Sequence, residues 1–231
     1  MPAQTLPAQP ASLYVQYGCG TCAPDSWLNF DASPRLRLER IPLIRGILRA
    51  TIGPLFPANA RPGDVVAGLP VPDGAAAGVY CSHVLEHLPR NELPAALRET
   101  SRMLRPGGCF RLVVPDLRWR ARRYLAAAEA GQPDASDQYL DACALGTRER
   151  ARGPLALLRL HLGRSAHLWL YDFAGLRALL DAAGFVDIRE CALGDSGDPM
   201  FVPVEEASRF FAGGERELAI EAYKPAHPAV G

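Results

Sequence analysis

Short apolar runs typical of β-strands alternate with amphipathic helical segments along almost the whole chain. The predicted helices cover Glu92–Leu104, about 117–130 and about 173–183, and the last ends at Gly184, a residue suited to the left-handed conformation. This alternation is typical of an α/β protein with a doubly wound, mostly parallel sheet. The seven predicted strands are Leu13–Tyr17, Trp27–Asp31, Asp64–Ala67, Gly78–Ser82, Cys109–Val114, Val186–Cys191 and Glu217–Tyr223.

The composition fits one globular domain. Of 231 residues 48% are hydrophobic, and 25 Lys and Arg balance 25 Asp and Glu. Zero net charge argues against a protein whose main partner is nucleic acid. No apolar stretch reaches the roughly 20 residues of a membrane span, and the N-terminus lacks the pattern of a signal peptide. We therefore expect a cytoplasmic protein with no nucleic-acid partner and no transmembrane segment.

The six cysteines do not form the framework of a small disulfide-rich protein, because the chain is too long and its cysteines too few. Cys19 and Cys22 have the spacing of a redox or zinc motif, but no second pair of this kind follows. A tight loop that contains two cysteines is the favoured interpretation, with redox or zinc chemistry as the alternative.

Residues that follow the predicted strands are the first candidates for function, because ligands of open α/β sheets bind at the carboxyl ends of the strands. Glycines at such a position let the backbone approach a ligand, and an acid at the next strand end can bind a ribose diol. This pattern alone is generic to nucleotide-type cofactors. The residues in question are Gly18-Cys19-Gly20, Asp31, Leu69-Pro70, Ser82-His83 and Pro115-Asp116.

Three longer stretches carry a more specific resemblance: GLPVPDGAAAGVYCSHVLEHLP, ALRETSRMLRPGGCFRLVVPD and LYDFAGLRALLDAAGFVDI. Together they resemble the class I S-adenosylmethionine-dependent methyltransferases, in particular a small single-domain, type-11-like subgroup. The resemblance runs from about Leu13 to Pro225. It implies a Rossmann-like, seven-stranded fold with a helical insert after the fifth strand, and S-adenosylmethionine as the cofactor.

The resemblance also implies roles for individual residues. Gly18, Cys19 and Gly20 would surround the methionine part of the cofactor, with backbone N–H groups near its carboxylate. Asp31 would bind the ribose. Asp64 or the valines after it, together with Leu69, would border the adenine. The cofactor-binding residues expected on this basis are Tyr17, Gly18, Cys19, Gly20, Asp31, Ala32, Asp64, Leu69, Ser82 and His83.

The sequence departs from the general pattern in two places. Asp31 comes only eleven positions after Gly20, so the first crossover helix is expected to be reduced to a turn, helped by Pro24. This shortening, shared by the subgroup, leaves the amino-acid end of the cofactor less covered. Second, an acid common before the fourth strand is replaced by Ala75-Ala-Ala-Gly78, which we interpret as the loss of a peripheral contact.

Histidines are the candidate catalytic residues. A hydroxyl acceptor needs a general base, whereas an amine or thiolate can do without one. His83 follows a strand end near the expected methyl group, His167 precedes the late helix in a region that faces the acceptor in this family, and His87 is a third candidate. Glu86 is interpreted as structural. The sequence predicts no metal site, since only His83 and His87 have even weakly suitable spacing.

An arginine-rich stretch between residues 147 and 164 belongs to a predicted basic lid or insert at about 132–168. It is interpreted as a lid that recruits an anionic acceptor, with a membrane-surface helix and a solvated helix face as alternatives. The arginines are Arg148, Arg150, Arg152, Arg159 and Arg164. The predicted domain spans 13–225 between a flexible tail at 1–12 and a C-terminal tail at 226–231.

The expected activity is O- or N-methylation of a small-molecule or glycan-type acceptor. One alternative is a non-catalytic protein that keeps the fold as a binding or scaffold partner. Another is an NAD-dependent oxidoreductase, because GCGTCA fits the G-x-G-x-x-A pattern, although Pro24 interrupts the helix that should begin there.

Overall fold

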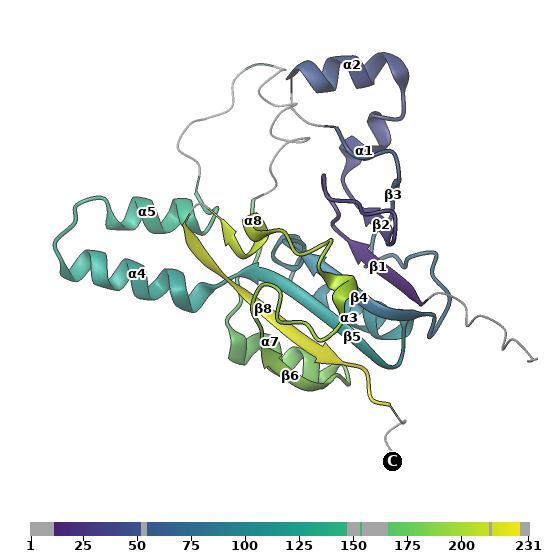
Figure 1. Cartoon of the computed structure of the whole chain (residues 1–231). Coiled ribbons are helices and arrows are strands. Elements are labelled where there is room, and N and C mark those ends of the chain that lie inside the picture. Colours follow the sequence, from purple (N-terminus) through teal and green to yellow (C-terminus); the bar gives the residue numbers. More distant parts are fainter. Residues whose placement is uncertain (1–11, 52–54, 147–152, 154–165, 213, 227–231) are drawn as a thin grey trace, which may run out of the picture.

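The computed structural model of the protein describes residues 12–51, 55–146, 153, 166–212 and 214–226. Its centre is a twisted sheet (Figure 1) with the strand order β3-β2-β1-β4-β5-β8-β6. Pairs from β3 to β5 are parallel, whereas β8 runs antiparallel to β5 and β6. The strands are β1 (Leu13–Tyr17), β2 (Leu28–Asp31), β3 (Ala60–Pro62), β4 (Ala76–Ser82), β5 (Leu104–Pro115), β6 (Val186–Glu190), β7 (Phe211–Ala212), paired with β8, and β8 (Glu215–Tyr223). The predicted doubly wound, mostly parallel fold is confirmed.

One face of the sheet is covered by helices whose apolar residues recur at helical spacing. Leu93 and Leu97 of α3 and Leu176 and Leu180 of α7 are fully buried in one core cluster, in which α3 packs on β5 and α7 packs on β6 and β8. The N-terminus of α7 is capped by the Asp172 carboxylate. The helices are α1 (Pro34–Leu38), α2 (Pro42–Thr51), η1 (Leu85–His87), α3 (Leu93–Met103), α4 (Leu117–Glu129), α5 (Ala135–Ala142), α7 (Phe173–Ala182), η2 (Pro199–Phe201) and α8 (Ala207–Phe210).

The opposite face is covered by a segment from near the C-terminus. Phe201 of η2 packs edge-on against Tyr14 of β1 and Trp27, and Phe210 of α8 joins the same buried cluster. The Trp27 indole donates a hydrogen bond to the Met200 carbonyl at 3.0 Å. The late segment therefore lies against β1, where a long first crossover helix would otherwise pack.

The connection between β1 and β2 contains turns and no helix, as predicted. Buried Asn29 of β2 closes this connection, because its side-chain amide donates to the carbonyls of Pro24 and Trp27, both at 2.9 Å. Gln16 donates to the Asn29 side-chain oxygen from the neighbouring strand. The short crossover is thus held in place by buried side-chain hydrogen bonds.

The predicted strand at Asp64–Ala67 is wrong. The third strand is β3, which ends at Pro62, and the residues from Val65 to Ala67 form a turn. The Asp64 carboxylate accepts from the N–H of Val66 at 2.9 Å and so initiates this turn. Val65 is buried, but it packs against the core from a loop. The β-branched residues therefore predicted correctly that Val65 is buried, but they predicted incorrectly that this segment pairs in the sheet.

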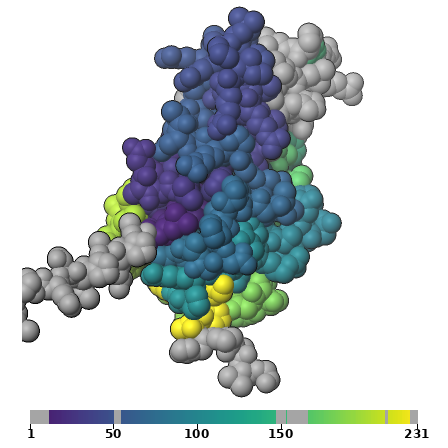
Figure 2. Space-filling view, turned by 90° about the vertical axis from the view of Figure 1, so that its right-hand side faces the viewer, coloured from purple at the N-terminus to yellow at the C-terminus, as the bar shows by residue number. Residues whose placement is uncertain are grey.

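The segment between β2 and β3, for which no structure was predicted, forms α1 and α2. The Ser33 hydroxyl caps α1, and Pro34 occupies its first turn. Figure 2 shows this dark blue segment standing out from the rest of the molecule. Helices α4 and α5 extend side by side at another edge (Figure 1).

The arginine-rich stretch at 147–164 lies, except for residue 153, outside the described residues. None of the described helices is long and apolar enough to cross a membrane.

Candidate active site

The turn after β1 requires glycine for two reasons. Gly18 has φ +72°, and Gly20 has φ +54°, in the left-handed region that L side chains rarely adopt. A Cβ atom on Gly18 would also lie 2.0 Å from Cγ2 of Val84. The chain that follows β4 can therefore pass directly beside the end of β1 only because Gly18 has no side chain.

Asp31 ends β2 and connects it to this glycine turn. Its carboxylate accepts hydrogen bonds from the N–H of Gly20 at 3.0 Å and from the N–H of Ser33 at 2.8 Å. A carboxylate has about four acceptor positions, so two remain for a diol. Asp31 is half-buried and the adjacent Ala32 is exposed.

The backbone of the turn is already engaged within the protein. The N–H of Cys19 donates to the Phe30 carbonyl at 3.0 Å, and the N–H of Gly20 donates to Asp31. These two donors therefore do not face an anionic ligand in this conformation. Burial raises the pKa of the Cys19 thiol to about 12 and also raises the pKa of Cys22. Both thiols stay protonated at neutral pH, which fits the interpretation as a tight loop.

Arg209 of α8, which sequence reasoning missed, lies beside the same turn. Its Nη2 donates to the Cys19 carbonyl at 2.8 Å, and its Nε bonds Glu206 at 3.2 Å. The same Nη2 is 3.9 Å from the position that a Cβ atom would take on Gly20. No local pattern identifies Arg209, because 190 residues separate it from its partner Cys19.

Leu69 lies in the loop after β3 and is held there by side chains of α3. Its N–H donates to Oε1 of Glu99 at 2.7 Å, and Arg102 donates to the carbonyls of Leu69 and Val71. The hydrogen bond from Arg102 lowers the pKa of Glu99, so the carboxylate that fixes this loop stays ionised. Asp64 is exposed and belongs to the surface turn described above.

Two of the predicted site residues are buried in the sheet. The Tyr17 side chain lies in the core, where its hydroxyl is 3.0 Å from the hydroxyl of Thr100, so only its backbone faces the strand end. Ser82 ends β4, and its buried hydroxyl has no hydrogen-bond partner among the described residues. An unpaired buried hydroxyl at a strand end is a position where a bound ligand can supply the missing partner.

His83 follows Ser82 with an unusual backbone conformation, φ +54°. Its Nδ1 is 3.1 Å from Oε1 of Glu86, and its Nε2 is 2.9 Å from the Arg209 carbonyl. Burial by itself lowers the pKa of His83, but the hydrogen bond and charge of Glu86 outweigh burial and raise it. Both ring nitrogens are thus occupied, and His83 connects η1 to α8 at the carboxyl end of β4.

His87 and His167 come together from distant parts of the sequence, with ring centroids 5.0 Å apart. Nδ1 of His87 lies 3.2 Å from the Ala166 carbonyl, and Nδ1 of His167 lies 2.8 Å from the Cys143 carbonyl. Burial lowers the pKa of His167, so its imidazole is neutral at neutral pH.

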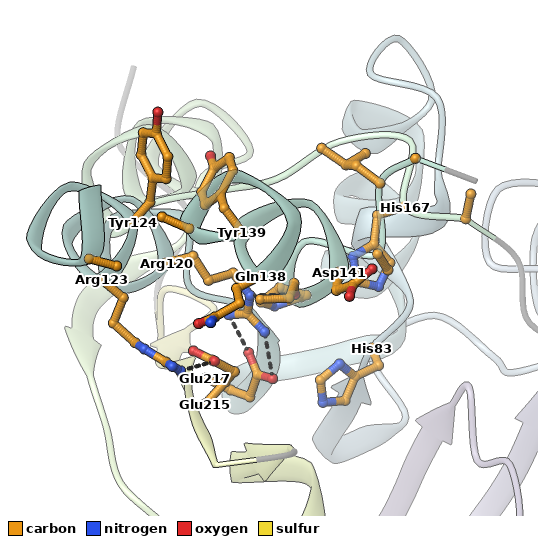
Figure 3. A pocket seen from close by; sticks show the side chains of 18 of the residues that line it. His83, Arg120, Arg123, Tyr124, Gln138, Tyr139, Asp141, His167, Glu215 and Glu217 are labelled. Atoms are coloured by element: carbon orange, nitrogen blue, oxygen red, sulfur yellow. Dashed lines mark hydrogen bonds and ion pairs between the residues drawn. The ribbon is translucent and has the colours of Figure 1, made fainter. Parts of the chain in front are cut away.

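A cavity of about 1500 Å³ opens between α4, α5, η1 and the start of β8. Figure 3 shows His83 and His167 at one end and Arg123 and Tyr124 at the other. Arg120 forms a bidentate ion pair with Glu217 at 2.9 Å, and Arg123 pairs with Glu215. The lining also includes His87, Pro115, Ala127, Gln138, Tyr139 and Asp141. The walls therefore carry both donors and acceptors, with the described arginines already neutralised.

The fold is Rossmann-like, and a glycine turn with an acid at the next strand end is typical of enzymes that bind a nucleoside cofactor. A family model described as a methyltransferase domain matches residues 19–190, and the chain belongs to this family. It is a class I methyltransferase, and S-adenosylmethionine is its cofactor. The glycine turn, the remaining acceptor positions of Asp31 and the unpaired Ser82 hydroxyl fit this cofactor.

One solved structure with a TM-score of 0.50 agrees with the fold. An S-adenosylmethionine-dependent methyltransferase from Methanosarcina mazei aligns with a TM-score of 0.50 and 16% identity, over 93% of this chain and 92% of that one. A methyltransferase from Thermotoga maritima, described as a possible histamine N-methyltransferase, aligns with a TM-score of 0.47 and 16% identity, over 94% and 84% of the two chains. No curated protein matches the sequence significantly. The family assignment sets aside the oxidoreductase alternative.

Proposed function

We propose that the enzyme methylates an oxygen or nitrogen atom of a small-molecule or glycan-type acceptor bound in the cavity between α4 and α5. The observation that carries this proposal is the position of His83. This residue directly follows β4, beside the glycine turn, and it also lines the cavity. A cofactor bound at the strand ends would therefore have its methyl group close to the cavity.

The side chains of the cavity wall favour one class of acceptor. The two described arginines of the wall are paired with Glu215 and Glu217, and Gln138 and Tyr139 also line the cavity. A neutral molecule with many hydroxyl groups can bond to both members of each ion pair. This lining supports a polyhydroxylated acceptor more directly than an anionic one. The proposed recruitment of an anion depends on arginines outside the described residues.

The cofactor residues take the roles that the family resemblance implies, with one change. Asp31 binds the ribose and Leu69 borders the adenine. The backbone donors of Cys19 and Gly20 are occupied, so we assign the cofactor carboxylate to Arg209, whose guanidinium lies at the turn. An arginine is well suited to bind a carboxylate through two parallel hydrogen bonds.

The three histidines are assigned to the acceptor side. His83 is a positioning residue, because both of its nitrogens are occupied by Glu86 and the Arg209 carbonyl. His87 and His167 line the cavity and present the groups that contact the acceptor. The cofactor supplies an electrophilic methyl group, and alignment of the acceptor with the S–CH3 bond can itself lower the barrier by several kcal/mol.

Two variants of α4 test the location of the acceptor. Ala127 lines the cavity, whereas its neighbour Ala128 is exposed and does not line it. Production of S-adenosylhomocysteine is measured with panels of hydroxyl and amine small molecules and of oligosaccharides. We expect Ala127→Trp to lower turnover at least tenfold with S-adenosylhomocysteine affinity unchanged, and Ala128→Trp to retain turnover. Equal turnover in both variants, or turnover with proteins alone, would overturn the proposal.

A further inference from the structure

Three potential ligand side chains converge at the histidine end of the cavity. One carboxylate oxygen of Glu86 and one ring nitrogen each of His87 and His167 lie within 4.8 Å of one another. Glu86 and His87 belong to η1, and His167 lies just before α7. The backbone fastens the two segments together, because the N–H groups of Leu168 and Trp169 both donate to the Glu86 carbonyl, at 2.7 and 3.1 Å.

The hydrogen bonds of both histidines orient their rings in the way that metal ligands require. A carbonyl oxygen only accepts, so Nδ1 of His87 and Nδ1 of His167 each carry the proton that binds the Ala166 and Cys143 carbonyls. In a neutral imidazole the lone pair then lies on Nε2. Histidines that bind metals characteristically donate their other N–H to a carbonyl or carboxylate in this manner.

The buried carboxylate of Glu86 also points to a bound cation, independently of the histidines. The residue is 0% exposed, and its Oε1 is bound by His83. Its Oε2 is buried without a hydrogen-bond partner among the described residues. A buried carboxylate oxygen without a partner is costly, and a cation beside it would remove that cost.

We propose that Glu86, His87 and His167 bind a divalent transition-metal ion of the zinc type through Oε2 and the two Nε2 atoms. Two imidazoles and one carboxylate form a known ligand set for such ions and leave at least one coordination position open. His87 and His167 line the cavity, so the open position faces it. If the proposed acceptor site is correct, an oxygen atom of the acceptor occupies that position; metal binding itself does not depend on the acceptor.

The experiment measures metal binding directly. The full-length protein is treated with chelator, equilibrated with ZnCl2 and desalted, and bound zinc is counted by elemental analysis; Co2+ is used in parallel for its visible absorption. We expect one equivalent of zinc for the wild type. His167→Gln, His87→Gln and Glu86→Gln should each weaken zinc binding at least tenfold.

Three controls test the location of the zinc, the folding of the variants and the independence of zinc binding from cofactor binding. The double variant Cys19→Ser/Cys22→Ser should keep its zinc, and loss of zinc there with retention in the histidine variants would place the ion at the cysteine pair and overturn the proposal. Absence of zinc from the wild type would also overturn the proposal. Titration with S-adenosylhomocysteine shows that each histidine variant is folded. Asp31→Ala should lose S-adenosylhomocysteine and keep zinc, so failure of cofactor binding and failure of metal binding are distinguished.

Discussion

The carboxylate of Asp31 accepts a hydrogen bond from the backbone N–H of Gly20 at 3.0 Å, so the acid at the end of β2 also holds the glycine turn that follows β1. The same carboxylate binds the N–H of Ser33. The proposed recognition of the ribose and the shape of the glycine turn therefore depend on the same side chain. This dual role is possible because the shortened crossover brings the turn directly against the neighbouring strand end.

Asp31→Ala should weaken cofactor binding strongly. The substitution removes the proposed ribose acceptor and releases the Gly20 N–H, so we expect the Kd for S-adenosylhomocysteine to rise at least tenfold, equivalent to about 1.4 kcal/mol. Calorimetric titration measures this change. Asp31→Asn, which keeps one oxygen in place, should show a smaller loss; an unchanged Kd in Asp31→Ala would contradict the assignment.

Gly18→Ala should damage the protein more than another glycine substitution with the same backbone strain. The new Cβ would lie 2.0 Å from Val84 at a φ of +72°. Gly74 has a φ of +65° and no atom within 4 Å of its Cβ position. Gly74→Ala should therefore cost only the conformational strain of about 1–2 kcal/mol, whereas Gly18→Ala should lower stability further and also weaken cofactor binding. Thermal unfolding of the two variants side by side measures the difference, and equal losses would rule out the clash.

Arg209→Met should weaken the binding of ligands that carry the amino-acid carboxylate. We expect a Kd for S-adenosylhomocysteine at least tenfold higher, with little change for 5′-methylthioadenosine, which lacks that group. Arg216→Met is a suitable control, because Arg216 is 56% exposed and pairs with Glu190 at the surface. Equal effects on both ligands would show that Arg209 acts through the turn and not through the carboxylate.

Arg111→Met should destabilise the fold severely. The guanidinium is 1% exposed and binds Glu205, Glu221 and Asp195. Its removal takes away the buried cation that Glu205 and Glu221 share and leaves Glu221 with Arg189 alone, a situation that costs about 3–5 kcal/mol. Arg189→Met is the comparison, since Arg189 is 45% exposed and its pairs are worth about 0–1 kcal/mol. Urea unfolding should separate the two variants clearly; similar midpoints would contradict this explanation.

Stability should fall at acidic pH, partly through Asp195. Burial raises the pKa of Asp195, but hydrogen bonds from Arg189, the Ala192 N–H and Arg111 outweigh burial and lower it. A carboxyl group with a lowered pKa in the folded state stabilises the protein above its unfolded value, about 3.9, and loses this effect as the pH falls through the folded value. Asp195→Asn should therefore reduce the difference between urea midpoints at neutral pH and near pH 3. An unchanged difference would exclude Asp195 as a contributor.

Several features could be read from local sequence. The run Leu13–Tyr17 coincides with β1, the helical periodicity after Glu92 coincides with α3 (Leu93–Met103), and Gly184 has the predicted positive φ after α7. These predictions succeed because strand alternation, helical spacing and glycine conformation depend on neighbours in the chain. The strand predicted at Asp64–Ala67 is wrong because β-branched residues indicate only that a segment is buried. Whether a buried segment pairs in a sheet depends on which other segments lie beside it.

The sequence by itself determined the strand-and-helix order, the glycine turn and the acid that follows it, and through longer motifs the methyltransferase family. Only the tertiary structure brought Arg209 to the Cys19 carbonyl and His167 to His87. Each pair joins segments far apart in the chain. Their proximity results from how the C-terminal segment covers β1 and how the chain before α7 packs on η1, and no spacing along the sequence encodes such packing.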